Sequence, residues 1–227
     1  MFKLEREMTE VVRRWLLEQK LFVKTEFQTP WGICDLVGAE FREHQVQRRL
    51  SYRQFSTLGS PLRAAIILKI PEHKSGRSVS IQQLADKFRC DDTAHIEDAI
   101  NCLEDRRFII RTRAGGLQKV NGWYPLHRRV VAVELKLAKI EEVARQAVQH
   151  FAFATESYVG LPMPVAERLV LRSIVPILGR QFGIIGVGKD KCKVLRKPVI
   201  DAKSIEPAIQ MYLTEKFWPD ISQAMKH

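Results

Sequence analysis

The sequence predicts an α/β protein that carries a helix-rich insertion. Short runs of β-branched residues alternate with amphipathic stretches in the first and last parts of the chain, which is typical of a mixed sheet flanked by helices. The segment Leu58-Gly59-Ser60-Pro61 breaks this alternation, and a different pattern of short helices begins there. We therefore expect one discontinuous domain over residues 1–58 and 126–227, with a second domain inserted at residues 59–125.

Before the insertion, the sequence predicts a helix followed by a hairpin. Apolar residues recur at helical spacing from Leu4 to Lys20, so this segment is expected to be an amphipathic helix. Residues 22–27 and 33–37 have the composition of two short strands, and the proline and glycine within 28–32 favour a turn between them. The charged segment 41–55 is expected to be a helical connector.

The insertion is predicted to contain three short helices and a two-stranded ribbon. The expected elements cover residues 62–70, 80–88, 92–107, 108–113 and 117–124. Ser60 and Pro61 suit the N-cap and first position of a helix, and Gly115-Gly116 suits the tip of the ribbon. This order of elements resembles a winged helix-turn-helix over residues 60–125.

After the insertion, strands and helices alternate again. The expected elements are a strand at 129–137, a helix at 140–155, a strand at 158–162, a helix at 165–178 that Pro176 disturbs, a hairpin of residues 182–187 and 192–195, and a helix at 204–217. These segments complete the mixed sheet and its covering helices.

The most informative segment is Glu134-Leu135-Lys136, at the end of the apolar run Val130-Val131-Ala132-Val133. Residues i and i+2 of a strand project from the same face, so an acid and an amine are expected side by side. Asp35 lies inside another predicted strand, where a carboxylate is costly unless it meets a cation, a partner or solvent. A divalent cation held by carboxylates beside an ammonium group is chemistry suited to phosphodiester hydrolysis.

The order of the predicted elements resembles the PD-(D/E)xK nuclease superfamily, which has a restriction-endonuclease-like fold. A helix is followed by a hairpin that ends in Ile33-Cys34-Asp35-Leu36-Val37, then by a strand that ends in Val133-Glu134-Leu135-Lys136, and then by another helix. The resemblance covers about residues 4–40 and 128–200. It implies that Asp35, Glu134 and the carbonyl of Leu135 bind Mg²⁺ or Mn²⁺, and that Lys136 acts in catalysis.

The same resemblance implies two further catalytic residues. Gln146 occupies the helix after the lysine strand, where several branches of the superfamily carry a glutamine that contacts water, backbone or the scissile phosphate. Many members also have an acid on the first helix that points into the site. Glu10 is the candidate here, with Glu5 and Glu7 as rivals.

A formal net charge of +11 indicates a polyanionic partner, and nucleic acid fits best. The third helix of the insertion has acidic outward positions, which disfavour ordinary reading of bases in the major groove. The wing is therefore expected either to contact the nucleic-acid backbone or minor groove, or to leave the acidic helix as a protein-binding face. The basic residues predicted to contact nucleic acid are Arg106, Arg107, Arg111, Arg113, Lys119, Arg128 and Arg129.

Other classes of site have little support in the sequence. The four cysteines and six histidines show no spacing typical of a metal site. Gly183-Ile184-Ile185-Gly186-Val187-Gly188-Lys189 approaches a phosphate-binding loop, but Asp190 stands where serine or threonine is required. No apolar run approaches the roughly 18 residues of a membrane helix, and the charged start lacks a secretory signal. We therefore expect a cytoplasmic protein that does not enter a membrane.

Together these observations predict a Mg²⁺-dependent nuclease that acts on DNA, with the winged helix engaging substrate or a partner. A homodimer or another protein bound through the insertion is compatible with the sequence. The main alternative is a catalytically inactive nucleic-acid-binding regulator, or a subunit of a nuclease complex, that uses the winged helix. The sequence does not distinguish DNA from RNA, or single from double strands.

Overall fold

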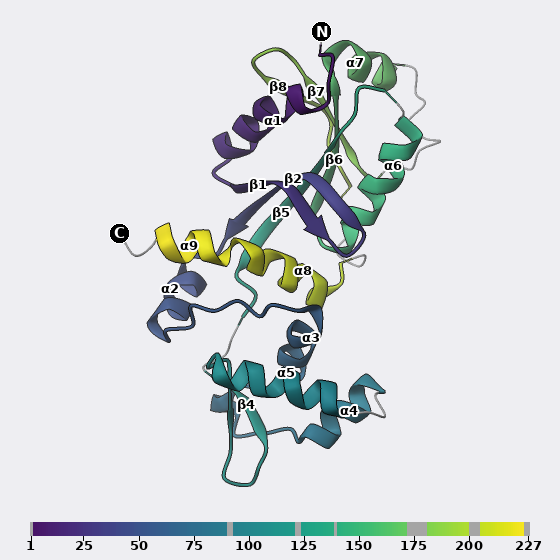
Figure 1. Ribbon diagram of the computed structural model, residues 1–227. Helices are drawn as coiled ribbons and strands as arrows, with labels where there is room; N and C mark the ends of the chain where they lie inside the picture. The colour runs from purple at the N-terminus through teal and green to yellow at the C-terminus, as the bar shows by residue number, and fades with distance from the viewer. Residues whose placement is uncertain are drawn as a thin grey trace. The chain divides into compact units, whose positions relative to one another are not determined.

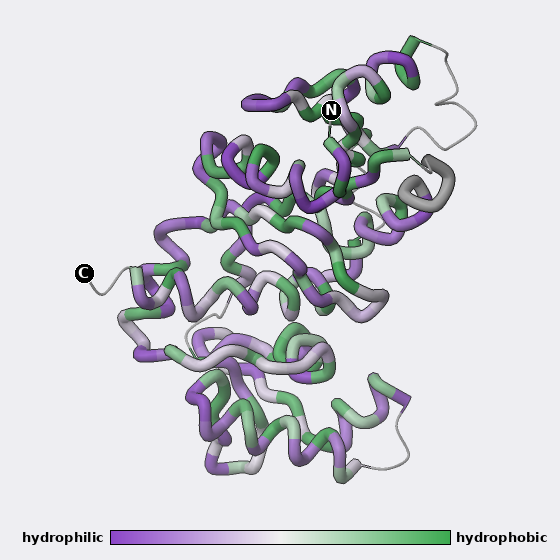
Figure 2. The backbone as a smooth tube through the Cα atoms, turned by 45° about the horizontal axis from the view of Figure 1, so that its top comes forward, coloured by the Kyte–Doolittle hydropathy of each residue, from purple (hydrophilic) through white to green (hydrophobic). Residues whose placement is uncertain are grey.

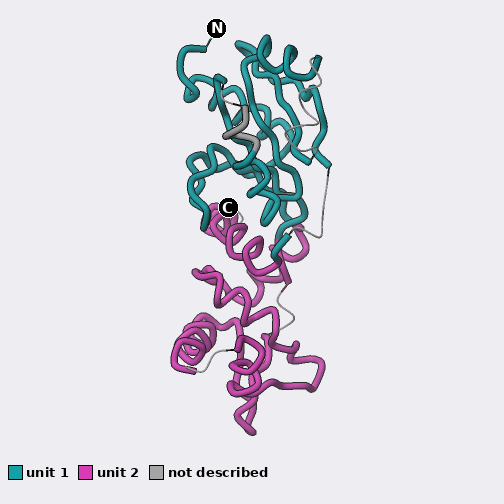
Figure 3. The backbone as a smooth tube through the Cα atoms, turned by 90° about the vertical axis from the view of Figure 1, so that its right-hand side faces the viewer, with its two compact units in different colours: residues 1–41, 127–206 teal, residues 42–126, 207–227 magenta. Residues whose placement is uncertain are grey.

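The computed structural model describes residues 2–89, 93–120, 124–138, 140–171, 181–199 and 205–224. The chain forms two compact units, coloured separately in Figure 3. Unit 1 contains Met1–Phe41 and His127–Glu206, and unit 2 contains Arg42–Leu126 and Pro207–His227. These bounds differ from the predicted domain boundaries, because the connector after residue 41 and the C-terminal helices belong to unit 2.

Unit 1 is built on a six-stranded mixed sheet with the strand order β1-β2-β5-β6-β7-β8 (Figure 1). Its strands are β1 (Phe22–Thr29), β2 (Gly32–Phe41), β5 (His127–Leu135), β6 (Glu156–Pro162), β7 (Gly183–Val187) and β8 (Cys192–Arg196). β5, β6 and β7 run parallel, and the other neighbouring pairs are antiparallel. The mixed α/β sheet predicted from the sequence is therefore confirmed, as are both predicted hairpins.

Helices cover both faces of this sheet. On one face, α1 (Arg6–Glu18) packs its stripe of Met8, Val12 and Leu16 against side chains of β2, β5 and β7. On the other face, α6 (Ile140–Gln149), the 3-10 turn η2 (His150–Ala152) and α7 (Met163–Leu171) pack against β6 and β7. Alternate residues of a strand point to opposite faces, so β6 and β7 contribute to both cores.

Several predicted elements differ in length from the observed ones. The helix expected at 140–155 ends as α6 at Gln149 and continues only as a 3-10 turn. The helix expected at 165–178 is α7, described from Met163 to Leu171, and Pro176 lies outside the described residues. The apolar and polar positions alternate along the helices (Figure 2). No described helix has the length and hydropathy needed to cross a membrane.

Unit 2 contains helices and one antiparallel two-stranded ribbon. Its elements are α2 (Glu43–Ser51), α3 (Pro61–Lys69), η1 (His73–Ser75), α4 (Ile81–Phe88), α5 (Ala94–Asp105), β3 (Ile109–Arg111), β4 (Leu117–Lys119), α8 (Pro207–Thr214), η3 (Glu215–Phe217) and α9 (Trp218–Ala224). As predicted, the Ser60 side chain caps α3 and Pro61 occupies its first turn. Ser80 and Gln83 form a capping box at the start of α4.

A buried ion pair explains why the C-terminal helices belong to unit 2. Nη2 of Arg49 in α2 donates to Oε2 of Glu215 in η3 at 2.9 Å, and the two side chains are 2% and 3% exposed. The Arg49 guanidinium also lies over the ring of Trp218, whose Nε1 donates to the carbonyl of Phe55 at 2.9 Å. These contacts join residues 42–58 to residues 207–224, which the sequence analysis assigned to the other domain.

Candidate functional site

The predicted acids meet where the start of β2 lies beside the end of β5. Leu36 pairs with Val133 in this antiparallel ladder, so the residues just outside the pair, Asp35 and Glu134, become neighbours. Their carboxyl groups are hydrogen-bonded to each other. The backbone N–H of Leu135 donates to Oδ2 of Asp35 at 2.7 Å. Sheet pairing thus brings together residues that are a hundred positions apart in the sequence.

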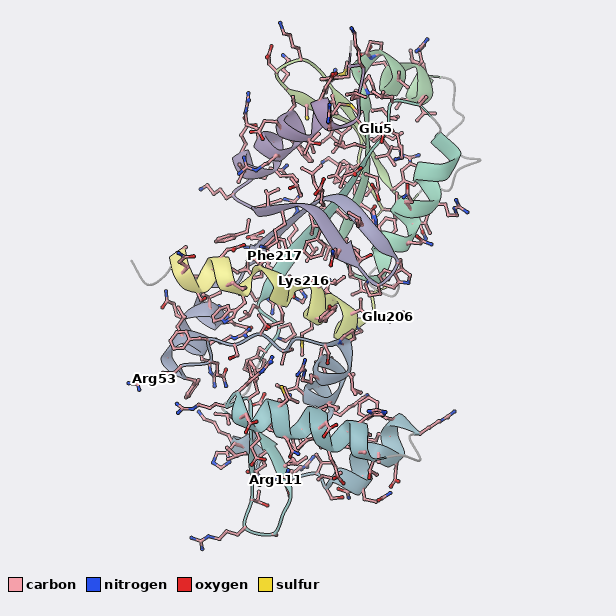
Figure 4. The ribbon with its side chains drawn as sticks, in the orientation of Figure 1. Glu5, Arg53, Arg111, Glu206, Lys216 and Phe217 are labelled. Carbon is pink, nitrogen blue, oxygen red and sulfur yellow. The ribbon has the colours of Figure 1, made fainter. Side chains whose placement is uncertain are left out.

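Lys136 follows the last residue of β5 and connects this pair to α1. Its backbone N–H donates to the carbonyl of Gly160 in β6 at 3.0 Å, which fixes the main chain. Its Nζ lies 3.1 Å from Oε2 of Glu5, the N-cap residue of α1. Figure 4 labels Glu5.

Burial makes the ionised state of the paired carboxyl groups unfavourable. Burial raises the pKa of Asp35 to about 7, and the adjacent Glu134 adds to the effect, while the Leu135 N–H and Lys136 oppose it. Burial also raises the pKa of Glu134, against the opposing effects of Asp35 hydrogen bonds and Lys136. For Lys136, burial lowers the pKa, but Glu5, Asp35 and Glu134 outweigh burial and raise it above its ordinary value.

Two cavities adjoin the carboxyl pair. A cavity of about 270 Å³ is lined by Glu5, Arg6, Thr9, Thr25, Glu26, Asp35 and Leu135. A smaller cavity of about 50 Å³ is lined by Thr29, Trp31, Gly32, Ile33, Glu134, Gln146, Gln149 and His150. Asp35 therefore faces the space beside α1, and Glu134 faces the space beside α6. The predicted catalytic residue Gln146 lies in the second group.

The second cavity contains residues that the sequence analysis did not assign to a site. His150 Nε2 lies 3.5 Å from Oε1 of Glu134, and the Cys34 thiol completes a cluster with them. Burial lowers the pKa of His150 to about 4, so its imidazole is neutral at pH 7. Burial raises the pKa of the Cys34 thiol, with Glu134 and Asp35 adding to the effect. No sequence spacing indicates this cluster, because its members come from three separate elements.

The acid of the first helix that reaches the site is Glu5, not the predicted Glu10. Glu10 is 65% exposed and forms an ion pair with Arg13 at 3.5 Å. Glu7 is exposed, and its Oε2 accepts a hydrogen bond from the backbone N–H of Lys3 at 2.7 Å. Helical periodicity accounts for the difference: Glu5 precedes the buried Met8 by three residues and Val12 by seven, which puts it on the inner face.

Most of the basic residues predicted to bind nucleic acid in unit 2 have partners within the unit. Arg111, labelled in Figure 4, contacts Oε2 of Glu104 at 2.8 Å and Oδ1 of Asn101 at 2.9 Å. Nη1 of Arg106 donates to the carbonyl of Thr57 at 2.5 Å. Burial lowers the pKa of Lys119, and Glu72 opposes this. Arg107 and Arg113 are exposed, and neither forms an ion pair with the part of the chain that is described.

The two basic residues predicted in unit 1 are also paired with acids. Arg129 is half-buried, and its Nη2 lies 2.9 Å from Oε2 of Glu156 and 3.1 Å from Oε1 of Gln19. Arg128 is 70% exposed on its side chain and lies 3.1 Å from Glu40. Of this pair, Arg128 is the better placed to exchange its partner for a phosphate, since exposed ion pairs contribute little stability.

Comparisons with known proteins do not assign the chain to a family. No family model matches the chain, and no curated protein matches its sequence. Among solved structures, a protein of unknown function from Silicibacter pomeroyi matches with a TM-score of 0.46 and 9% identity, covering 99% of this chain and 92% of that chain. A similarity at this level carries no argument about the fold or the activity of the chain.

Proposed function

We propose that the protein is a metal-dependent nuclease that hydrolyses phosphodiester bonds in DNA. The observation that carries this proposal is the convergence of Glu5, Asp35, Glu134 and Lys136 at one end of the sheet, beside a cavity of about 270 Å³. Three acids and one amine from three separate segments of the chain are more than a salt bridge at the end of one strand requires. Together with the sheet order, they support a restriction-endonuclease-like unit 1 of PD-(D/E)xK type.

The donor atoms of this site fit Mg²⁺ or Mn²⁺. Two carboxyl groups in hydrogen-bond contact are a costly arrangement unless a proton or a cation lies between them. The pKa of Asp35 is raised first by burial and then by this contact with Glu134. Both ions prefer oxygen ligands. Asp35, Glu134 and the carbonyl of Leu135 would hold the cation, with Glu5 close by. When bound, the cation would neutralise phosphate charge and lower the pKa of a water molecule.

Lys136 is proposed to stabilise charge on the scissile phosphate. Its raised pKa keeps the amine protonated at neutral pH, which makes it a poor general base and a suitable partner for an anion. Glu5 orients the ammonium group through its ion pair. Gln146, which shares a cavity with Glu134, is proposed to hold water or substrate on the α6 side.

Unit 2 is proposed to be a winged-helix module that engages DNA or a protein partner. Three helices followed by the β3–β4 ribbon match the expected order of elements. Arg107 and Arg113 are the ribbon-associated residues most available to phosphate, because they are exposed and Arg106 and Arg111 have partners within the unit. Outward acids on α5, including Glu97 and Asp98, would repel phosphates if α5 entered the major groove. Contact with the nucleic-acid backbone is therefore proposed for the ribbon.

The test is cleavage of supercoiled plasmid, single-stranded DNA and single-stranded RNA in Mg²⁺ or Mn²⁺. We expect nicking or linearisation of DNA by the wild-type protein, and a loss of about 100-fold or more in Asp35→Asn, Glu134→Gln and Lys136→Met. Cleavage that persists in all three variants would refute the proposed site. DNA binding without cleavage in either metal would instead favour the inactive regulator. Preferential cleavage of RNA would correct the proposed substrate.

A further inference from the structure

We propose that Cys34, Glu134 and His150 form a zinc site on the α6 side of the sheet, and that zinc bound there withdraws Glu134 from the Mg²⁺ site. The existence of the zinc site depends only on the three side chains. The competition with Mg²⁺ rests on the proposed nuclease function. Zinc would thus act as an inhibitor of cleavage.

The three ligand atoms are already close to the spacing that zinc requires. They all lie within 4.8 Å of one another, and His150 Nε2 is 3.5 Å from Oε1 of Glu134. Ligand atoms around tetrahedral zinc lie roughly 3.3 to 3.8 Å apart, given bond lengths of about 2.0 to 2.3 Å. Changes in side-chain torsions that move these atoms by about 1 Å are therefore sufficient.

Burial and a missing hydrogen bond point to a ligand at the same place. Cys34, Glu134 and His150 are 0%, 2% and 5% exposed. Oε1 of Gln146 is buried and has no hydrogen-bond partner among the described residues, which is a costly state for a polar atom. Gln146 precedes His150 by one helical turn and lines the same cavity of about 50 Å³. Its amide oxygen is proposed as the fourth ligand, because Gln146 shares this cavity with Glu134 and His150.

The chemistry of these ligands separates the zinc site from the Mg²⁺ site. A thiolate and an imidazole select zinc over Mg²⁺, whereas the oxygen donors around Asp35 suit Mg²⁺. The Cys34 thiol now lies 3.3 Å from the carbonyl of Leu36 as its acceptor. Formation of the zinc–sulfur bond breaks the S–H bond, and the proton goes to solvent. No oxidant or reductant is involved.

The carboxylate of Glu134 cannot coordinate Zn²⁺ and Mg²⁺ at the same time with both of its oxygen atoms. Its carboxyl group is hydrogen-bonded to Asp35 and also contacts His150. Coordination to zinc would direct its oxygen atoms toward His150 and Cys34, and Asp35 would lose its partner in holding Mg²⁺. Cleavage in a fixed concentration of Mg²⁺ is therefore expected to fall as zinc is added.

The experiment is a titration of the metal-free, full-length protein with Co²⁺, monitored by the thiolate-to-cobalt charge-transfer absorption and followed by displacement with Zn²⁺. We expect one equivalent to produce the absorption. Cys34→Ser should abolish it, and His150→Gln should weaken zinc binding by more than the roughly 10- to 100-fold that loss of an outer-shell partner costs, because His150 is a direct ligand. Cys192→Ser is the matched control, because Cys192 is a thiol outside the cluster, and it should leave the absorption unchanged.

The outcomes distinguish the zinc site from the nuclease proposal. Absence of the absorption in the wild-type protein, or its survival in Cys34→Ser, would overturn the zinc site. If circular dichroism shows that Cys34→Ser is unfolded, unchanged zinc affinity in His150→Gln would overturn it. Asp35→Asn should keep the absorption but lose cleavage. A wild-type protein that has the absorption but cleaves nothing would refute the nuclease alone, and cleavage unaffected by saturating zinc would refute the competition.

Discussion

At the scale of single residues, Glu5 and Glu10 lie on the same helix but have different surroundings. Glu5 contacts the ammonium group of Lys136, and Glu10 contacts an exposed arginine. Their separation of five residues corresponds to about 500° of rotation around the helix axis, which puts them on different faces. Their contrast offers an internal comparison of two chemically identical side chains.

Glu5→Gln is predicted to reduce the rate of DNA cleavage by about 10-fold, because Lys136 loses the charge that orients it. Glu10→Gln on the same helix should stay within about twofold of the wild type. Single-turnover rates with plasmid DNA in Mg²⁺ measure both effects. Equal rates for the two variants would mean that the Glu5–Lys136 contact has no role in the reaction.

Asp35→Asn is predicted to stabilise the fold at neutral pH in the absence of metal. The pKa of Asp35 in the folded protein, about 7, exceeds the value of about 3.9 expected when unfolded. The folded state therefore binds more protons between these values, and Asp35 makes the free energy of unfolding fall as pH rises from about 4 to 7. The substitution should raise the stability at pH 7.5 by about 1 to 2 kcal/mol, or roughly 2 to 8 °C.

Thermal melts at pH 4.5 and pH 7.5 measure this effect. The advantage of Asp35→Asn should be small at the lower pH, where the aspartate is protonated in the folded protein. Asp190→Asn, at an exposed turn position, is the control and should show no such pH dependence. A variant less stable than the wild type at pH 7.5 would contradict the prediction.

The sequence was sufficient to predict part of the candidate site and not the rest. Asp35 and Glu134 could be proposed as partners only through the resemblance to the PD-(D/E)xK superfamily, because no local pattern predicts the antiparallel ladder of β2 and β5 that makes them neighbours. Glu5 could have been chosen over Glu10 from the helical periodicity. Cys34 and His150 could not be assigned, since their proximity depends on how the end of α6 packs against the sheet, a contact that no local pattern encodes.

At the scale of elements, the sequence predicted strands better than helix ends and long-range associations. Both hairpins of unit 1 are confirmed, because their alternating residues and turn residues act locally. The association of α2 with η3 and α9 was not predicted. It depends on the Arg49–Glu215 ion pair, whose members are 166 residues apart. Sequence patterns predict that a charged residue such as Arg49 is exposed to solvent, because they do not reveal a buried partner that is distant in the chain.

Arg49→Met is predicted to destabilise unit 2 by about 3 to 5 kcal/mol, because Glu215 would remain buried without a cation. Arg42→Met, at an exposed position of the same segment, should change stability by less than about 0.5 kcal/mol. Urea denaturation followed by tryptophan fluorescence reports on the loss, since Trp218 lies beside Arg49. A double variant with Glu215→Leu should recover part of the stability. No recovery would argue against the ion pair as the cause.

At the scale of the whole molecule, the net charge of +11 predicts that DNA binding weakens steeply with salt. The logarithm of the affinity should fall linearly with the logarithm of the salt concentration. Arg107→Ala and Arg113→Ala should each reduce the magnitude of that slope by about 1. Arg111→Ala should reduce it less, because Glu104 already neutralises this guanidinium. Fluorescence anisotropy with a labelled duplex at several salt concentrations measures the slopes, and identical slopes would place the DNA contacts elsewhere.

The composition of unit 2 from two separate segments has a consequence for biosynthesis. All the acids and the lysine of the proposed nuclease site emerge from the ribosome before Glu215 does. Until that point, Arg49 lacks the carboxylate with which it forms its buried ion pair, since Glu215 follows it by 166 residues. A nascent chain can therefore contain all of unit 1 before unit 2 is complete, and premature termination near residue 206 would leave unit 2 without this ion pair.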